Sequence, residues 1–250
     1  RWAPAFFDRV IRMVERDKNH ACIIAWSLGN ETGHGPSHDA MAGWIRHYDP
    51  TRLLHNESAI SEQGGAGAHF DRGHASSDLI CPMYCDLDTL RAWSRDGDDP
   101  RPLILSEYSH AMGNSCGGLA DYWHAFTHDP GLQGGFVWDW VDQAIRAENG
   151  DHWRYGGDFG EEIHDHDFCC NGLVDADRRI HPHANELQRL IQPLAVTAGD
   201  PASGRVEIHN RRAFTHLGDL AGTWTVAVDG TVVQRDHLPF FFNDTATTET

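Results

Sequence analysis

The sequence contains the stretch Cys22-Ile-Ile-Ala-Trp-Ser-Leu28, followed closely by Glu31, and the stretch Pro102-Leu-Ile-Leu-Ser106, which runs directly into Glu107. Consecutive apolar residues bounded by turn residues are typical of a strand that is covered on both faces. In β/α barrels, the residues at the carboxyl ends of such strands carry the chemistry. We therefore expect Glu31 and Glu107 at the tips of two buried parallel strands.

Strands and helices alternate along the first part of the chain. The apolar spacing predicts helices over residues 4–19, 37–48 and 119–126, and strands at 53–54, 78–84, 102–107 and 135–140. Ser37 suits the N-cap of the second helix. Alternation of this kind indicates a parallel sheet with right-handed crossovers. Its fold class is α/β, a partial (β/α)8 TIM barrel with about strands 4 to 8, the earlier strands being expected upstream of Arg1.

The character of the sequence changes around His181-Pro182. Residues 205–209 and 223–228 alternate with period 2, and Asp229-Gly230 predicts a tight hairpin turn. The last residues resemble a translated sequencing adapter, the alternative being a natural apolar strand with a polar tail. We expect the C-terminal part of a TIM barrel over residues 1–183, the start of an all-β sandwich over 184–239 and a non-native tail over 240–250.

Composition narrows the class of protein. The 250 residues are 40% hydrophobic, which supports a real core, and the net charge of -17 argues against a nucleic-acid partner. No apolar stretch reaches the roughly 20 residues that cross a bilayer, so no membrane association is expected. The six cysteines lack zinc-site spacing and read as reduced thiols, with Cys22 in a core strand. A cytoplasmic location fits, although Arg1 looks internal and a signal peptide upstream stays open.

Two carboxyl groups on one barrel face suit glycoside hydrolysis. One carboxyl protonates the leaving oxygen, while the other attacks the anomeric carbon or activates water. A gap of about 5 Å between them leads to retention of configuration and a wider gap to inversion. The separation of Glu31 and Glu107 along the sequence leaves both outcomes open.

The residues around both glutamates resemble a known family. Ile23-Ile-Ala-Trp-Ser-Leu-Gly-Asn-Glu-Thr-Gly-His-Gly35 closely resembles the acid/base segment of glycoside hydrolase family 2. The stretch Arg101-Pro-Leu-Ile-Leu-Ser-Glu-Tyr-Ser-His-Ala-Met-Gly-Asn114 resembles the nucleophile segment of its large bacterial β-galactosidase type. Leu132-Gln-Gly-Gly-Phe-Val-Trp-Asp-Trp-Val-Asp-Gln143 and Phe168-Cys-Cys-Asn-Gly-Leu-Val174 resemble further segments of these enzymes, in the same order.

The resemblance implies a retaining β-galactosidase on a (β/α)8 barrel whose fourth and seventh strands end at Glu31 and Glu107. Glu107 would be the nucleophile, and Glu31 the proton donor and later the general base. The alternatives are a family 2 β-glucuronidase or β-mannosidase, or a chain that is inactive by itself. The resembled enzymes also suggest a homo-oligomer at full length.

The resemblance further implies a sugar-binding set of Asn30, Tyr84, His110, Trp138 and Asn171. Tyr84 would orient the nucleophile and Trp138 would form the floor of the pocket, since an indole face suits the C–H face of galactose. Without the resemblance, Trp138 could equally be a core residue.

Two cations are implied in the same way. Glu31 would touch Mg²⁺, and the Phe168 carbonyl and Asn171 would help hold Na⁺, while the other ligands belong to sequence upstream of Arg1. The clusters around His34 and over residues 164–167 look like metal-ligand sets, but we interpret both as solvated loops. Asp139 and Asp142 flank Trp140 and are expected to hold loops.

Overall fold

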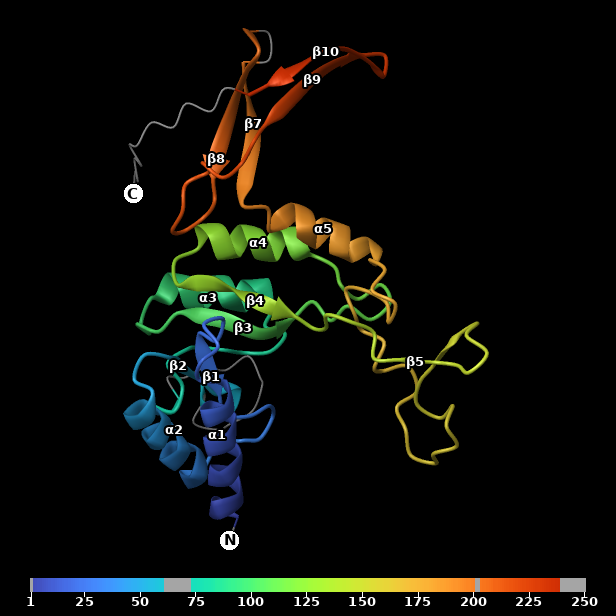
Figure 1. The fold of residues 1–250 in the computed structure, drawn as a ribbon. Coiled ribbons are helices and arrows are strands. Elements are labelled where there is room, and N and C mark those ends of the chain that lie inside the picture. The colour runs from blue at the N-terminus through green and yellow to red at the C-terminus, as the bar shows by residue number, and fades with distance from the viewer. Residues whose placement is uncertain (1, 61–72, 201–202, 239–250) are drawn as a thin grey trace. The chain divides into compact units, whose positions relative to one another are not determined.

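The computed structural model describes residues 2–60, 73–200 and 203–238 (Figure 1). The chain divides into two compact units, Arg1–Leu190 and Ile191–Thr250. The sequence placed this change after residue 183. Helix α5 (Pro182–Leu190) belongs to the first unit because Leu187 and Leu190 pack against its core. The expected tail over 240–250 lies outside the described residues.

The first unit alternates strands and helices, as the sequence predicted. Its elements before α5 are α1 (Ala3–Asp17), β1 (Ala25–Ser27), α2 (Pro36–Tyr48), β2 (Leu53–His55), the 3-10 helix η1 (Glu57–Ala59), α3 (Leu87–Asp96), β3 (Leu103–Tyr108), α4 (Leu119–His128), β4 (Leu132–Val137), β5 (Ile145–Arg146) and β6 (Trp153–Arg154). Strands β5 and β6 form a small antiparallel pair.

Parallel pairing follows the order of the chain. β1 pairs with β2 and β3 with β4, both in parallel. The expected strand over 78–84 joins β3 only through isolated bridges, Ile80 to Leu103 and Met83 to Glu107. The backbone N–H of Asp78 links this segment to β2 by donating to the carbonyl of Leu54 at 2.9 Å. The segments therefore present their carboxyl ends at one edge, as a barrel segment requires.

A further parallel contact extends this order beyond β4. Val141 bridges Val174, and the N–H of Asp139 donates to the carbonyl of Asn171 at 2.7 Å. β4 itself ends at Val137, so Trp138 lies just after the strand and not within it as expected over 135–140. The residues that follow β4 thus run beside 171–174.

The stretch Cys22–Leu28 is less buried than its apolar run predicted. Trp26 and Leu28 are buried in a core with α1 and α2, whereas Ile24 is 72% exposed and Cys22 is exposed outside β1. The prediction of a strand covered on both faces is therefore wrong here, because β1 begins only at Ala25 and Ile24 lies before it, outside the core of α1 and α2. β3 is different, since Leu103 and Leu105 are fully buried.

The start of α2 also differs from the prediction. Its N-cap is Gly35 and not Ser37, and Pro36 opens the first turn. Proline is well suited to that position because its missing N–H would have no helical partner there. The local preference of proline therefore prevails over the capping preference of serine.

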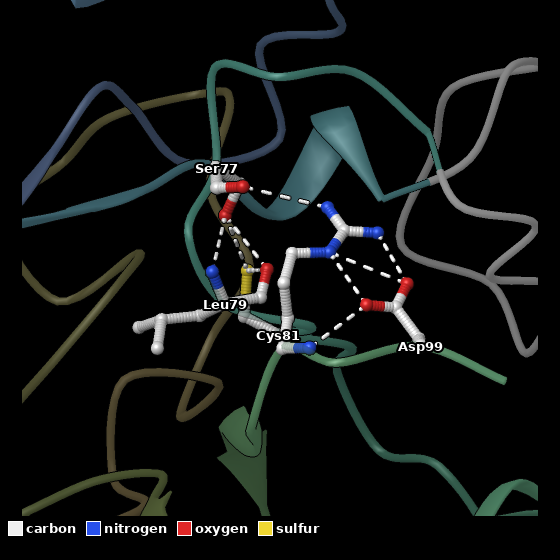
Figure 2. A network of polar contacts seen from close by, with 5 residues as sticks. Ser77, Leu79, Cys81 and Asp99 are labelled. Carbon is white, nitrogen blue, oxygen red and sulfur yellow. Dashed lines mark hydrogen bonds and ion pairs between the residues drawn. The ribbon is translucent and has the colours of Figure 1, made fainter. Parts of the chain in front are cut away.

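A polar network fixes the segment that leads into residues 78–84 (Figure 2). The guanidinium of Arg101 pairs with the carboxylate of Asp99 at 2.6 Å and donates to the carbonyl of Ser77. The hydroxyl of Ser77 in turn donates to the carbonyl of Leu79 at 2.8 Å. This network ties the entry of β3 to its neighbouring segment and so sets their register.

The second unit consists of two antiparallel hairpins. β7 (Leu194–Asp200) pairs with β8 (Arg205–Asn210), and β9 (Thr223–Val228) pairs with β10 (Thr231–His237). The turn between β9 and β10 has positive φ at Asp229 and Gly230, which confirms the predicted hairpin. Within residues 191–200 and 203–238 each sheet has two strands, so no sandwich is closed there.

None of the helices in the described ranges combines the length and the apolar character that crossing a bilayer requires.

The packing of β2 makes a direct test of the core. Leu54 is fully buried among α1, α2 and β1, while its neighbour Leu53 is 46% exposed. We expect Leu54→Ala to lower the free energy of unfolding by about 2–5 kcal/mol, since it leaves a cavity. Leu53→Ala is the matched control and should cost less than about 1 kcal/mol. Urea unfolding followed by tryptophan fluorescence measures both, and equal losses would contradict this description of the core.

Candidate active site

Polar side chains gather where the parallel segments end. Glu31 follows β1, Tyr84 follows the bridged segment, Glu107 lies near the end of β3 and Trp138 follows β4. Because neighbouring parallel strands end at the same edge of a sheet, residues far apart in the sequence share one site. The predicted placement of Glu107 near a strand end is confirmed, whereas Glu31 lies in the loop beyond β1, which ends at Ser27.

Glu107 and Tyr84 form the best-defined contact in the site. The hydroxyl of Tyr84 donates to Oε2 of Glu107 at 2.9 Å, and the backbone N–H of Tyr84 donates to the carbonyl of Glu107 at 2.8 Å. The Glu107 residue is only 9% exposed. A backbone hydrogen bond and a side-chain hydrogen bond therefore join the same two residues, Tyr84 and Glu107.

Burial raises the pKa of the Glu107 carboxyl, because desolvation disfavours its charged form. The Tyr84 hydrogen bond and the charge of His110 act the other way, while the charges of Glu31 and Glu57 raise the pKa further. The pKa of Tyr84 is also raised, first by burial and then by Glu107 and Glu31. Glu31 thus acts on both partners, which brings the two predicted carboxyls into one electrostatic site.

Glu31 itself is exposed and has φ of 51°, a conformation that L-residues rarely adopt. Its backbone N–H donates to Oε1 of Glu57 at 2.5 Å. Asn30, which precedes it, is also exposed. The side chain of Glu31, the acid/base candidate, is therefore open to solvent, while its backbone is held by the buried carboxylate of Glu57.

Tyr84 is connected, through ring contacts and one hydrogen bond, to His110, Phe168 and Asn171. The ring of His110 lies 6.1 Å from that of Tyr84 and stacks on Phe168 at 5.5 Å between centroids. The side-chain amide of Asn171 donates to the carbonyl of Phe168 at 3.2 Å. The structure therefore links four residues that the resemblance had placed around the sugar.

Trp138 is half-buried and belongs to neither core cluster of the described residues. Its backbone N–H donates to the carbonyl of Tyr108, and its carbonyl accepts from Ala111. These bonds hold the indole directly after β4, beside the end of β3. Trp138 is therefore not part of the described core, and its place under the sugar stays a prediction.

Asp139 and Asp142 hold loops, as predicted. Asp139 accepts from the amide of Gln143 at 2.8 Å. Asp142 accepts from the backbone N–H of Gly172 at 2.7 Å and pairs with His181 at 3.0 Å. Both carboxylates thus fasten the chain after β4.

The fit to the two implied cations differs. Oδ1 of Asn171 is buried without a partner among the described residues, which would suit a hard cation, whereas the Phe168 carbonyl accepts a hydrogen bond from the amide nitrogen of Asn171. No group of three or more His, Cys, Asp or Glu side chains in those ranges suits a metal ion, so Glu31 lacks partners for Mg²⁺.

One of the two supposed solvated clusters is not solvated. The His34 side chain is 9% exposed, pairs with Asp39 at 2.9 Å and stacks on His74 with 3.6 Å between ring centroids. The prediction of a solvated loop is therefore wrong for His34, because the glycine loop folds back against its surroundings. Residues 165–167 are exposed as expected.

Sequence reasoning missed Glu57. This carboxylate is 1% exposed, directly follows β2 and lies within reach of the loop that carries Glu31. The signal was its position after the short run Leu53-Leu54, since every other predicted site glutamate also follows a strand.

A family model and curated relatives match most of the chain. The model of glycosyl hydrolases family 2, TIM barrel domain, matches residues 1–196. "Beta-galactosidase 2" of Enterobacter cloacae is 46% identical over 247 residues, which are 93% of this chain and 23% of that protein. A beta-galactosidase of Aeromonas hydrophila is 45% identical over 252 residues, 95% of this chain and 24% of its own length. The chain thus spans about a quarter of these relatives.

Solved structures share the fold at low identity. A beta-glucuronidase of Bacteroides uniformis aligns with 95% of this chain and 32% of its own, with a TM-score of 0.53 and 14% identity. One of Dictyoglomus thermophilum aligns with 75% of this chain and 35% of its own, with a TM-score of 0.51 and 17% identity. Because the family model covers most of the sequence and the fold agrees, the chain belongs to glycosyl hydrolases family 2 and carries part of its TIM barrel domain.

Proposed function

We propose that the protein is a retaining glycoside hydrolase that cleaves terminal, non-reducing β-D-galactosides through a covalent glycosyl-enzyme intermediate. The buried Glu107 carboxyl, oriented by the Tyr84 hydroxyl at 2.9 Å and influenced by the charge of Glu31, is the observation that carries this proposal. The two roles need carboxyls in different environments, and Glu107 is buried whereas Glu31 is exposed.

In the first step, a carboxylate oxygen of Glu107 attacks the anomeric carbon, and the bond from that carbon to the glycosidic oxygen breaks. Glu31 gives its proton to the departing oxygen, so the aglycone leaves as a neutral alcohol. In the second step, the Glu31 carboxylate takes a proton from water, and the resulting hydroxide oxygen displaces Glu107. Two displacements return the original configuration at the anomeric carbon.

The site supports different starting states for the two carboxyls. Tyr84 remains a hydrogen-bond donor because its own pKa is raised, and this donation stabilises the charged form of Glu107. Glu31 is exposed, so the aglycone and then the attacking water can reach it. Which carboxyl is the nucleophile and which the acid/base is taken from the resemblance.

A neutral sugar suits this environment better than a uronic acid. Three carboxylates act on the site, Glu31, Glu57 and Glu107, and of the groups that dominate the pKa of Glu107 only His110 can carry positive charge. The carboxylate of a glucuronide would meet net repulsion there. Relatives named beta-galactosidase at 42–46% identity favour the same substrate, with β-glucuronides and β-mannosides as the alternatives.

The remaining sugar contacts are assigned from the resemblance. We propose that Asn30, His110 and Asn171 meet sugar hydroxyls and that the half-buried Trp138 lies under the ring. An indole face buries the apolar C–H face of galactose without a hydrogen bond in the ring plane.

We further propose that the Phe168 carbonyl and Oδ1 of Asn171 help hold Na⁺. A bound cation would supply positive charge near the sugar oxygens. Oδ1 of Asn171, which has no partner among the described residues, supports this assignment, and the residue is 3% exposed. Mg²⁺ beside Glu31 has no comparable support in the described residues, so no step is assigned to it.

Turnover is proposed for the protein at the full length that its gene encodes, because this chain corresponds to about a quarter of its relatives. The chain by itself is expected to be inactive, since it contributes only part of the barrel. A cytoplasmic location and a homo-oligomeric state stay predictions.

The substrate assignment is tested with nitrophenyl β-galactoside, β-glucuronide and β-mannoside on the full-length protein. We expect the highest kcat/KM for the galactoside, because its neutral ring avoids repulsion from the three carboxylates. A preference for either other sugar would overturn the assignment, and hydrolysis of none of them would overturn the proposed function.

The two glutamates are distinguished by their leaving-group dependence. Glu107→Gln should abolish turnover of every galactoside. Glu31→Gln should slow phenyl β-galactoside by about 10²–10⁴-fold and the dinitrophenyl galactoside much less, since a good leaving group needs little protonation. Glu162→Gln, the same change at an exposed position, is the control. Equal losses on both substrates for Glu31→Gln would show that its role is misassigned.

The Tyr84 hydrogen bond is tested by Tyr84→Phe. This bond lowers the pKa of Glu107, so its loss raises that pKa further above its ordinary value. Glu107 must be ionised to attack, and the acid limb of the kcat/KM profile should therefore move to higher pH. The rate above that limb should fall about tenfold or more, the typical value of a bond to a charged group. Tyr155→Phe is the control, and an acid limb that stays in place would refute this role.

A further inference from the structure

Glu57 is a third carboxylate of this site, and neither the mechanism nor the resemblance gives it a role. Its residue is 1% exposed, at the turn from β2 into η1. Its Oε1 accepts from the backbone N–H of Glu31 at 2.5 Å and from the hydroxyl of Ser58 at 2.6 Å. Because Ser27 of β1 lies opposite His55 of β2, the residues that follow both strands emerge side by side.

The bond from Glu31 to Glu57 acts on a constrained backbone. Glu31 has φ of 51°, and a non-glycine residue keeps such a conformation only where its surroundings determine it. The loop around it is closely packed, since a Cβ at Gly29 would lie 2.8 Å from Cγ2 of Thr32. Thr32 in turn contacts Nε2 of His38 at 3.2 Å. The carboxylate of Glu57 is the acceptor that fixes the direction of the Glu31 peptide.

The position is costly for a residue with a purely structural task. Oε2 of Glu57 is buried without a hydrogen-bond partner in the part of the chain that the structure describes. A buried carboxylate with an unpaired oxygen lowers stability. The bond from the Glu31 N–H to Oε1 is therefore kept at a cost in stability, and an amide oxygen at the same place would accept the same bond.

We propose that Glu57 is a positioning residue that holds the backbone of Glu31, so that its carboxyl reaches the glycosidic oxygen. The inference rests on the proposed function, since it concerns the acid/base step. Glu57 does not touch the substrate; it acts through the N–H of Glu31. Its loss should therefore resemble a partial loss of Glu31 and not a general loss of activity.

The test compares Glu57→Gln, Glu57→Met and Glu57→Ala in the full-length protein, with phenyl and dinitrophenyl β-galactosides as substrates. Gln keeps an oxygen that accepts the Glu31 N–H, whereas Met keeps the volume without an acceptor and Ala removes both. We expect Met and Ala to lower kcat/KM for the phenyl galactoside at least about tenfold more than for the dinitrophenyl galactoside. Gln should stay within a few-fold of the wild type on both.

Glu15→Ala, on the exposed face of α1, is the matched control and should change neither ratio. Equal losses on the two substrates for Met and Ala would overturn the proposal, as would a selective loss in Gln as large as in Met. If neither acceptor-free variant folds while Gln does, the bond serves folding and the proposal also falls. A wild type that hydrolyses neither galactoside would instead overturn the proposed function.

Discussion

The parallel contact between residues 80–84 and β3 is the constraint on which the site depends. It places the N–H of Tyr84 on the carbonyl of Glu107 and the hydroxyl of Tyr84 on the carboxylate of the same residue. Backbone register and side-chain geometry thus select one pair. A ladder has few alternatives in register, because a slip by one residue reverses every side chain. At the other end of the segment, the polar network of Arg101, Asp99 and Ser77 stabilises that register.

The same contact buries the Glu107 carboxyl near other carboxylates, which raises its pKa, and neighbouring groups offset part of this rise. Burial and the neighbouring carboxylates disfavour the charged form of Glu107, and Tyr84 and His110 favour it. A core beneath the strand end is required, since without the buried Leu103 and Leu105 the ladder could not hold the carboxyls together. The core residues Leu103 and Leu105 and the proposed nucleophile Glu107 therefore lie on the same strand and differ in their distance from its end.

The features of the fold that depend on neighbouring residues could be predicted from the sequence. The runs before Glu31 and Glu107 predicted strand ends, and Asp229-Gly230 predicted its hairpin, because both depend on neighbouring residues. Burial could be predicted less well, because the exposure of Ile24 depends on which elements pack against it. Glu57 was missed because its contact with Glu31 joins loops that follow two different strands, and its position after Leu53-Leu54 was the only sequence signal.

The two predicted carboxyls differ in exposure, since Glu107 is buried and Glu31 is exposed. An acid/base group passes a proton to the leaving oxygen and takes another from water, so access to solvent serves it. A nucleophile gains from a dry setting, since water around its oxygens must otherwise be displaced. Exposure also lets the Glu31 side chain adopt unproductive orientations, because an acid that points away from the leaving group does not protonate it. A fixed backbone beneath an exposed side chain reconciles these demands, and the buried carboxylate of Glu57 supplies that anchor.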